Sequence, residues 1–217
     1  MNDKLFLRNP EESVLGKNIV KQGLTLINKL GFEDFTFKKL AVEVKTTEAS
    51  IYHYFENKHK LLVSLVTWYW SFLEYKVVFS TINITNPKLK LKTIIKLITE
   101  QSSNETESAY YISEFESYKL VIWEGAKSYL NKNVSKDNKD CLFKPYKDLC
   151  ERFSSIIKEY NAKYKFPHSL TTTIIEMAHS QKFFKQNLPA LTDFPGEEDD
   201  KEIILFLKSL LFCSIKV

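Results

Sequence analysis

Residues 36–62 read TFKKLAVEVKTTEASIYHYFENKHKLL, and this stretch decides the fold of the chain. From about Phe37 to Val44 the apolar residues recur at three- and four-residue spacing, which predicts a short helix with one buried face. A second helix is predicted from Glu48 to Tyr54. Thr36 and Thr47 stand where each helix would begin, and their hydroxyls can accept a free backbone N–H of the first turn. Because so few residues separate the two helices, they must turn sharply against each other, as in a helix-turn-helix.

The second of these helices is too short and too polar to be a core helix. It would bury only Ile51 and the following Phe55. The remaining side chains would point outward, and they are Glu48, Ala49, Ser50, Tyr52 and His53. A short helix with an outward polar face is built to be presented to another molecule.

The run T-F-x-x-L-A, followed by T-x-A-S-I-Y-H-Y-F-x-N-K-x-x-L-L, resembles the DNA-binding domain of TetR-family repressors. The preceding helix, residues 19–32, also fits, with small Gly23 where that family favours alanine. The resemblance covers roughly residues 10–65, and beyond it the chain matches only in length and helical character. Two positions depart from the family pattern, since Lys45 and Ala49 stand where glycine is usual. If position 45 requires a positive φ, lysine there costs about 1 kcal/mol.

The resemblance implies that the second helix enters the major groove with its N-terminal residues against base edges. Glu48 could accept from cytosine N4 and Ala49 could touch a thymine methyl. The predicted base-facing set is Thr47, Glu48, Ala49, Ser50 and His53, and the predicted phosphate contacts are Thr36, Tyr52, Tyr54 and Lys58, with Lys45 available to a guanine. The alternative is that these residues form an ordinary exposed polar face.

Composition allows a folded, helical protein and gives no signal of its own for nucleic acid. The chain has 217 residues, 44% of them hydrophobic, and only five glycines, which argues against a β-rich or glycine-loop fold. The net charge is +4, so any DNA contact must come from placed charges. The three cysteines have no paired short spacing, which predicts reduced thiols without a disulfide framework or metal site. With neither a signal peptide nor an apolar run of membrane length, we expect a cytoplasmic protein with no membrane partner.

The predicted fold is all-α, with about nine helices in two domains. Residues 1–62 form the helix-turn-helix DNA-binding domain of three helices, and residues 63–217 form a larger helical ligand-binding and dimerisation domain. The first helix is expected to begin at Asn9 and Pro10 and to stop at Gly31. After the helix-turn-helix, helices are expected at about 58–79, 88–100, 107–130, 140–164, 170–188 and 197–215. Polar stretches separate them at 80–86, 101–106 and 131–139, the last predicted to be a solvated loop.

Aromatic residues are dense between residues 68 and 146, which favours a ligand pocket between helices of the second domain. The predicted lining is Trp68, Phe72, Tyr75, Tyr111, Phe115, Trp123 and Tyr146. The alternative is that these aromatics are plain hydrophobic core.

The last helix is apolar nearly all round, so it needs burial on two sides. One side can face its own core and the other a second copy of the chain. The predicted dimer interface is Leu170, Ile174, Met177, Ile203, Leu207, Leu210 and Leu211. The alternative is a central buried helix in a monomer.

Together these features predict a homodimeric transcriptional regulator that binds a pseudo-palindromic DNA operator. The resemblance favours a repressor released by a small apolar or aromatic effector. A helical lipid-binding protein that no longer reads DNA is the alternative. Catalysis has little support, because His168 and His179 have no matching cysteine or carboxylate partners in the sequence, and we expect no cofactor and no metal.

Overall fold

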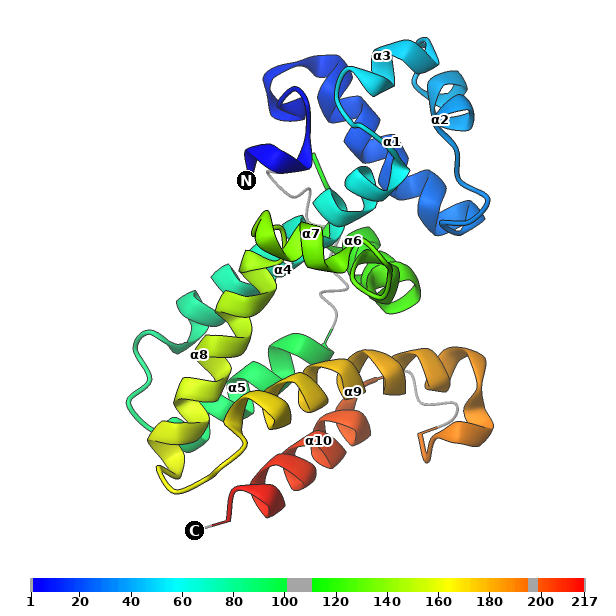
Figure 1. The fold of residues 1–217 in the computed structure, drawn as a ribbon. Helices are drawn as coiled ribbons and strands as arrows, with labels where there is room; N and C mark the ends of the chain where they lie inside the picture. Colours follow the sequence, from blue (N-terminus) through cyan, green and yellow to red (C-terminus); the bar gives the residue numbers. More distant parts are fainter. Residues whose placement is uncertain (1, 101–110, 195–198, 217) are drawn as a thin grey trace. The chain divides into compact units, whose positions relative to one another are not determined.

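The computed structural model describes residues 2–100, 111–194 and 199–216. Throughout these three ranges the regular structure is helical and contains no strand, so the all-α prediction is confirmed (Figure 1). It comprises ten α-helices and four short 3-10 helices, against the nine helices expected. None of the described helices has an apolar stretch long enough to cross a bilayer.

The α-helices are α1 Val14–Leu30, α2 Phe37–Glu43, α3 Glu48–Tyr52, α4 Lys58–Thr81, α5 Pro87–Thr99, α6 Glu114–Glu124, α7 Val134–Lys139, α8 Lys144–Tyr160, α9 Pro167–Asn187 and α10 Lys201–Ser214. The 3-10 helices are η1 Asp3–Leu5, η2 Pro10–Glu12, η3 Gly125–Ser128 and η4 Pro189–Leu191.

The chain divides into two compact units. Unit 1 is Met1–Tyr69 with Ser102–Lys144, and unit 2 is Trp70–Gln101 with Pro145–Val217. Helix α4 is continuous and contributes residues to both units. Helices α6 and α7 belong to the same compact unit as the helix-turn-helix, so the boundary between the units differs from the functional boundary expected at residue 62. The functional boundary stays a prediction.

In unit 1, α1 begins later than predicted. Asn9 and Pro10 do start a helix, but it is the single 3-10 turn η2, with the Asn9 side chain accepting from Glu11 N. The backbone is extended at Ser13, which then caps α1 by accepting from Gly16 N at 2.9 Å. At the other end, Gly31 has φ +80° and terminates α1 as predicted. Gly23 packs against Leu61, whose side chain would lie 3.0 Å from a Cβ at that position.

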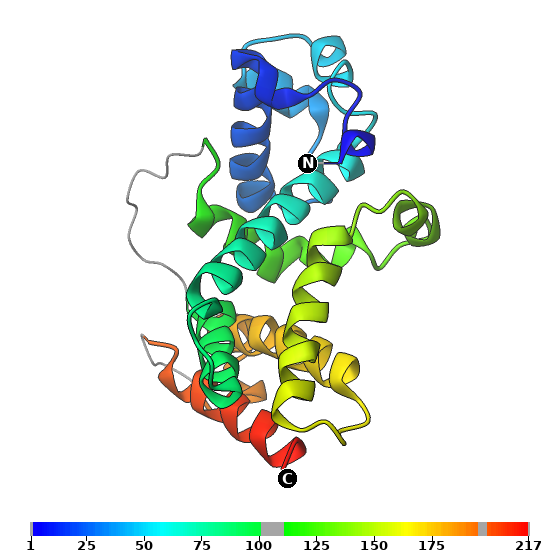
Figure 2. The ribbon, with the colours of Figure 1, turned by 90° about the vertical axis from the view of Figure 1, so that its left-hand side faces the viewer.

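Unit 2 is built from the second part of α4 and from α5, α8, α9 and α10. Helices α5, α9 and α10 lie against one another (Figures 1 and 2). Their facing side chains are fully buried, and they include Leu91, Ile94, Ile98, Ile174, Ile175, Ile203, Leu207 and Leu211. Asn86 caps α5, with its side chain accepting from Leu89 N at 3.2 Å.

Two predicted segments differ in the structure. Residues 131–139 were expected to be a solvated loop, but they contain helix α7. The helix expected over 107–130 is α6 at Glu114–Glu124, and it changes to the 3-10 turn η3 at Gly125. The predicted break at 101–106, the start of that helix and the first residues of the helix from 197 lie outside the described residues.

Candidate DNA-binding interface

The helix-turn-helix forms as its two caps predict. Thr36 Oγ1 accepts from Lys39 N at 3.2 Å, and Thr47 Oγ1 accepts from Ser50 N at 3.2 Å. Each bond satisfies a backbone donor that the first turn of a helix leaves open. Both short helices therefore start at fixed residues, which fixes the direction in which α3 leaves the turn.

The turn between α2 and α3 has a left-handed residue at Lys45, with φ +55°. Thr46 N then donates to Ala41 O at 2.9 Å and closes the turn. A side chain in this region costs about 1 kcal/mol relative to glycine. The condition stated for position 45 is therefore met, and the lysine side chain is exposed beside the start of α3.

Helix α3 presents most of its surface. Ile51 is the only buried residue in it. Thr47, Ala49, Tyr52 and His53 are exposed, and Glu48 and Ser50 are half-buried. The Tyr52 ring packs edge-on against Phe37 at 5.0 Å, which holds this aromatic at the edge of the face. The outward set predicted for this helix is therefore arranged on one accessible element.

Tyr54 was predicted to contact a phosphate, but the structure buries it. Its side chain is only 4% exposed, and its hydroxyl lies 2.8 Å from Ser13 Oγ at the start of α1. The Arg8 guanidinium lies over the ring at 5.6 Å. A side chain held in this way cannot reach a phosphate, so Tyr54 is a core residue of the domain.

Lys58 also has partners inside unit 1. Its ammonium donates to the carbonyls of Phe32 at 2.9 Å, Glu33 at 2.9 Å and Phe35 at 3.1 Å, and it lies over the Phe32 ring. An ammonium has three protons, so a phosphate contact would require Lys58 to give up one of these bonds. In this arrangement Lys58 fixes the loop that joins α1 to α2.

Sequence reasoning missed the contacts that α6 and η3 make with the same loop. Glu124 Oε1 accepts from Phe32 N at 3.0 Å, and Glu124 Oε2 lies 2.8 Å from Lys127 Nζ as an ion pair. Lys127 also reaches Glu33 at 3.2 Å. On the body of α1, Asn28 donates to the backbone and carboxylate of Glu116. Apart from Glu124 and Lys127, these partners are about ninety residues apart in the chain, so no local pattern could have pointed to their contacts.

The seven predicted pocket residues divide between the two units. Trp68, Tyr111, Phe115 and Trp123 belong to unit 1, and Phe72, Tyr75 and Tyr146 belong to unit 2. Tyr75 is 62% exposed and stacks on Phe79 at the surface, and Phe115 and Trp123 are exposed as well. The seven therefore do not enclose one cavity within either unit, and their role as a pocket stays a prediction.

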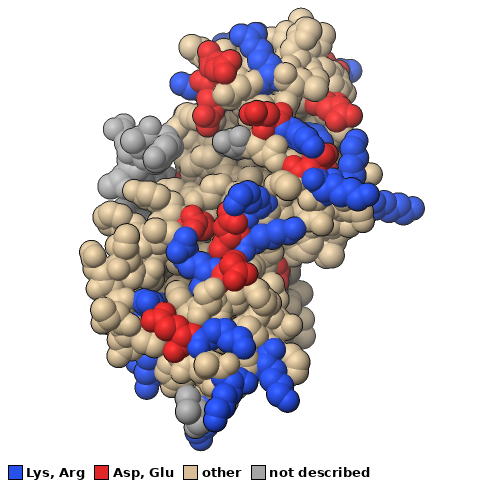
Figure 3. Space-filling view, turned by 60° about the vertical axis from the view of Figure 1, so that its left-hand side comes forward, with Lys and Arg blue, Asp and Glu red and all other residues tan. Residues whose placement is uncertain are grey.

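Unit 2 does contain a groove of about 610 Å³ between α4, α5 and α8. Its lining includes the apolar residues Val78, Ile82 and Ile156 together with charged side chains, among which Arg152 donates twice to Glu74 Oε1. Figure 3 shows that acidic and basic side chains are interspersed over the face of the molecule drawn there. The volume suits a small ligand, whereas the charged side chains differ from the aromatic lining that was predicted.

A polar–aromatic cluster lies in the core of unit 2. The Trp70 ring is 4.4 Å from Tyr146 and 5.5 Å from His179, and the Tyr146 hydroxyl donates to Glu176 at 2.9 Å. Burial lowers the pKa of His179 to about 4, because the charged imidazolium would lose its hydration there. Burial likewise raises the pKa of the neighbouring Cys150 to about 11, with a smaller opposing effect from Tyr146. His179 is therefore neutral at physiological pH.

Most of the predicted dimer residues lie in the core of unit 2. Leu170, Ile174, Ile203, Leu207 and Leu211 are buried there, while Met177 and Leu210 are half-buried. The apolar side chains that α10 leaves exposed are instead Leu205, at 60%, and Phe206, at 38%. In the segment that follows α9, Leu188 and Leu191 are exposed too, and Phe194 contacts Phe206 at 6.0 Å between ring centres.

Comparison with known proteins gives one family match. Residues 19–65 match the family described as "Bacterial regulatory proteins, tetR family". No curated protein sequence matches the chain.

Three solved structures illustrate the similarity of fold. AibR, crystallised with isovaleryl coenzyme A and operator DNA, has a TM-score of 0.61 and 17% identity over 89% of this chain and 96% of that one. The fatty acid degradation regulator FadR from Bacillus halodurans has a TM-score of 0.60 and 17% identity, over 89% and 96%. PfiT, described as a superantigen, has a TM-score of 0.58 and 17% identity, over 92% and 97%. At these identities the similarity concerns the fold alone.

Proposed function

We propose, from the premise that this chain belongs to the TetR family of bacterial transcriptional regulators, that it is a homodimeric repressor released from its operator by a small molecule. Regulators of this family act by binding DNA and are not enzymes. The observation that carries the proposal is α3, a capped helix with one buried residue and an otherwise accessible face. A helix with so little to bury in its own domain is available to enter the major groove.

The base-reading set in this proposal is Thr47, Glu48, Ala49, Ser50 and His53 on and beside α3. Thr36, Lys45 and Tyr52 flank it and supply contacts to phosphates or to a guanine. All of these residues are exposed or half-buried. Glu48 is the acceptor best suited to cytosine N4, and Ala49 offers a methyl to thymine.

Dimerisation would place two copies of α3 about one helical turn of DNA apart and would demand a pseudo-palindromic operator. The apolar face of α10 supports this part of the proposal, because Leu205 and Phe206 are large exposed apolar side chains and Phe194 packs against Phe206. Because its operator is bacterial DNA, the protein would act in the cytoplasm.

The effector would bind in unit 2 and act through α4, a continuous helix that contributes several turns to each unit. AibR was crystallised with isovaleryl coenzyme A and operator DNA, so that protein binds both a small molecule and DNA. Isovaleryl coenzyme A is accordingly the first compound to try. A compound that lowers operator affinity is an effector, and substitutions in the 610 Å³ groove then test whether it binds in unit 2.

Selection of bound sequences from random duplex DNA tests the function. We expect the wild-type chain to enrich a pseudo-palindrome. The double variant Glu48→Ala/His53→Ala should lose or change the enriched bases, because both side chains are replaced on the presented face of α3. Lys165→Ala, at an exposed position between α8 and α9, is the matched control and should enrich the wild-type sequence. Absence of enrichment would favour the lipid-binding alternative.

A further inference from the structure

Helix α7 is held to unit 1 mainly by charge. Its sequence is VSKDNK, and Asp137 is its only buried residue, with 2% of its surface exposed. A helix normally docks through an apolar stripe, which α7 lacks. The attachment must therefore come from the partners of Asp137 and from the chain on either side.

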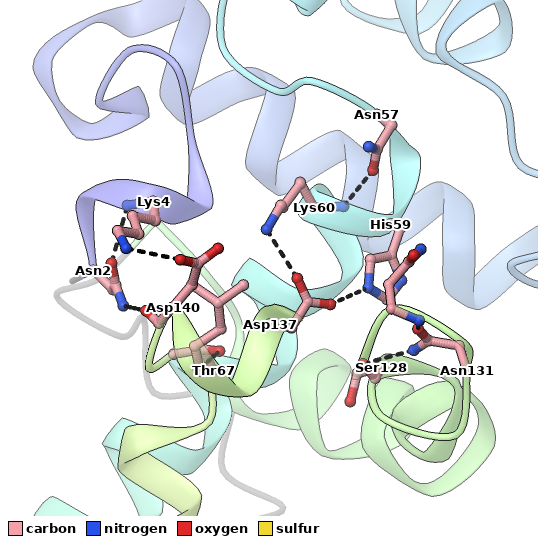
Figure 4. A network of polar contacts seen from close by, with 12 residues as sticks. Asn2, Lys4, Asn57, His59, Lys60, Thr67, Ser128, Asn131, Asp137 and Asp140 are labelled. Atoms are coloured by element: carbon pink, nitrogen blue, oxygen red, sulfur yellow. Dashed lines mark hydrogen bonds and ion pairs between the residues drawn. The ribbon is translucent and has the colours of Figure 1, made fainter. Parts of the chain in front are cut away.

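The partners of Asp137 are two successive residues in the first turn of α4. Oδ1 accepts from Lys60 Nζ at 3.0 Å, and Oδ2 lies 2.9 Å from His59 Nε2 (Figure 4). Lys60 is itself 8% exposed, so the Asp137–Lys60 pair is shielded from solvent. Removing one partner of such a pair strongly destabilises the fold, because the other charge would stay buried without compensation.

The first turn of α4 is also connected to α2 and α3 of the helix-turn-helix. Asn57 caps it by accepting from Lys60 N at 2.9 Å, and Lys58 donates to three carbonyls of the loop before α2. Asn57 follows α3 by only a short connection, residues 53–56. A displacement of this turn is therefore passed to α2 through Lys58 and to α3 through the chain.

The N-terminal arm closes the arrangement from a second side. Asn2 donates to Asp140 O at 2.7 Å, and Lys4 forms an ion pair with Asp140 at 2.7 Å, directly after α7 (Figure 4). Leu5 is fully buried against Val63 and Leu142, and Leu7 N donates to Tyr54 O just after α3. The arm thus joins the end of α3 to the end of α7.

We propose that Asp137 is a positioning residue for operator binding, acting through Lys60 and His59 to fix the first turn of α4 and with it the recognition helix α3. This inference rests on the proposed function. Asp137 would touch no DNA itself. Loss of its charge should loosen α7 and allow α3 to take more than one orientation, so that fewer molecules at any time present it correctly to the operator.

The test compares Asp137→Asn with the wild-type full-length chain. Asparagine keeps the size of the side chain and removes its charge. We expect operator Kd to rise at least about tenfold, which corresponds to about 1.4 kcal/mol. The slope of log Kd against log salt should not change, because no phosphate contact is lost. Lys139→Ala, at an exposed position of the same helix, should keep the wild-type Kd.

Hydrogen exchange of the free protein separates positioning from general stability. In Asp137→Asn, amides of α3, α7 and the first turn of α4 should exchange faster, while those of α9 and α10 stay unchanged. Asp137→Glu should recover part of the protection and affinity, since it restores the carboxylate. Equal Kd and equal exchange in Asp137→Asn and wild type would overturn the inference, as would faster exchange throughout the chain. If the wild-type chain selects no DNA, the proposed function fails, while exchange in α3 still decides whether Asp137 holds that helix.

Discussion

Lys45 occupies a backbone conformation that favours glycine, and the turn between α2 and α3 depends on it. The sequence located this turn and identified position 45 as the one where a positive φ would matter. It could not determine the φ angle, because a lysine can also sit in a turn with ordinary angles. The helices on either side impose +55° here, and the strain is local.

We expect Lys45→Gly to be more stable than Lys45→Ala by about 1 kcal/mol. Both substitutions remove the same charge, but only glycine relieves the left-handed strain. Urea unfolding of the two variants measures the difference directly. Equal midpoints would mean that position 45 is not strained in solution.

Because His179 is buried in its neutral form, we expect the free energy of unfolding to fall in acid. Its folded-state pKa, about 4, lies below the ordinary value of 6.5, so the unfolded chain takes up this proton at higher pH than the folded protein does. The stability due to neutral His179 is therefore present above pH 6.5 and is lost as pH falls toward 4, by about 3 kcal/mol. His179→Gln should flatten the pH dependence of unfolding free energy in this window. His168→Gln, at an exposed position of the same helix, serves as the matched control.

At the scale of elements, the first turn of α4 is where the domain is assembled. Lys58 was predicted to meet a phosphate, while its observed partners are three carbonyls. Hydrogen bonds from a charged donor contribute about 1.5–3 kcal/mol. Lys58→Ala should therefore destabilise unit 1 by about that amount, whereas Lys38→Ala on the exposed side of α2 should change stability by less than about 0.5 kcal/mol.

Operator binding distinguishes the two roles of Lys58. If it fixes the loop, Lys58→Ala weakens binding without changing the slope of log K against log salt. A slope reduced by about one unit would instead assign it to a phosphate. Measurements of operator affinity between 50 and 200 mM salt, a range over which such contacts are resolved, decide the question.

How much each element could be predicted depends on where its determinants lie. The caps at Thr36 and Thr47 and the stop at Gly31 involve neighbours in sequence, and the structure confirms them. Helix α7 was missed because its one buried residue pairs with Lys60, seventy-seven residues away. The same holds for Glu124 and the loop at Phe32. Local sequence patterns indicate where helices begin and end, but they do not indicate contacts between residues so far apart in the chain.

The buried side of α10 could not be predicted from the sequence either. The residues of that helix are apolar nearly all round, so the sequence could not decide which side unit 2 would cover. The structure buries Leu207 and Leu211 and leaves Leu205 and Phe206 exposed. The core side is the one that α5 and α9 contact.

We expect Leu205→Glu to give a folded monomer, because an exposed charge costs the isolated chain little but would be buried in a dimer. Leu207→Glu should instead unfold unit 2, since that side chain has no exposed surface. Light scattering reports the mass, and circular dichroism reports the fold. A dimer that survives Leu205→Glu would move the interface away from this face of α10.

At the scale of the whole molecule, the proposed switch requires that effector and operator favour different states. A coupling of about 1–3 kcal/mol corresponds to roughly a 5- to 150-fold loss of DNA affinity. The same factor must appear when DNA is present first and effector affinity is measured, because the coupling is reciprocal. Titrations in both orders, by fluorescence anisotropy and calorimetry, check this equality. A compound that binds tightly and leaves operator affinity unchanged is not the effector of this switch.

The central claim is that two copies of α3 read a symmetric operator, and a hydroxyl-radical footprint on the selected duplex tests it most directly. The account predicts two protected regions related by two-fold symmetry, with centres about one helical turn, or a simple multiple of it, apart. Leu205→Glu should lose this pattern at concentrations where the wild type protects both regions. A single asymmetric protected region, or no protection by the wild-type chain, would contradict the account.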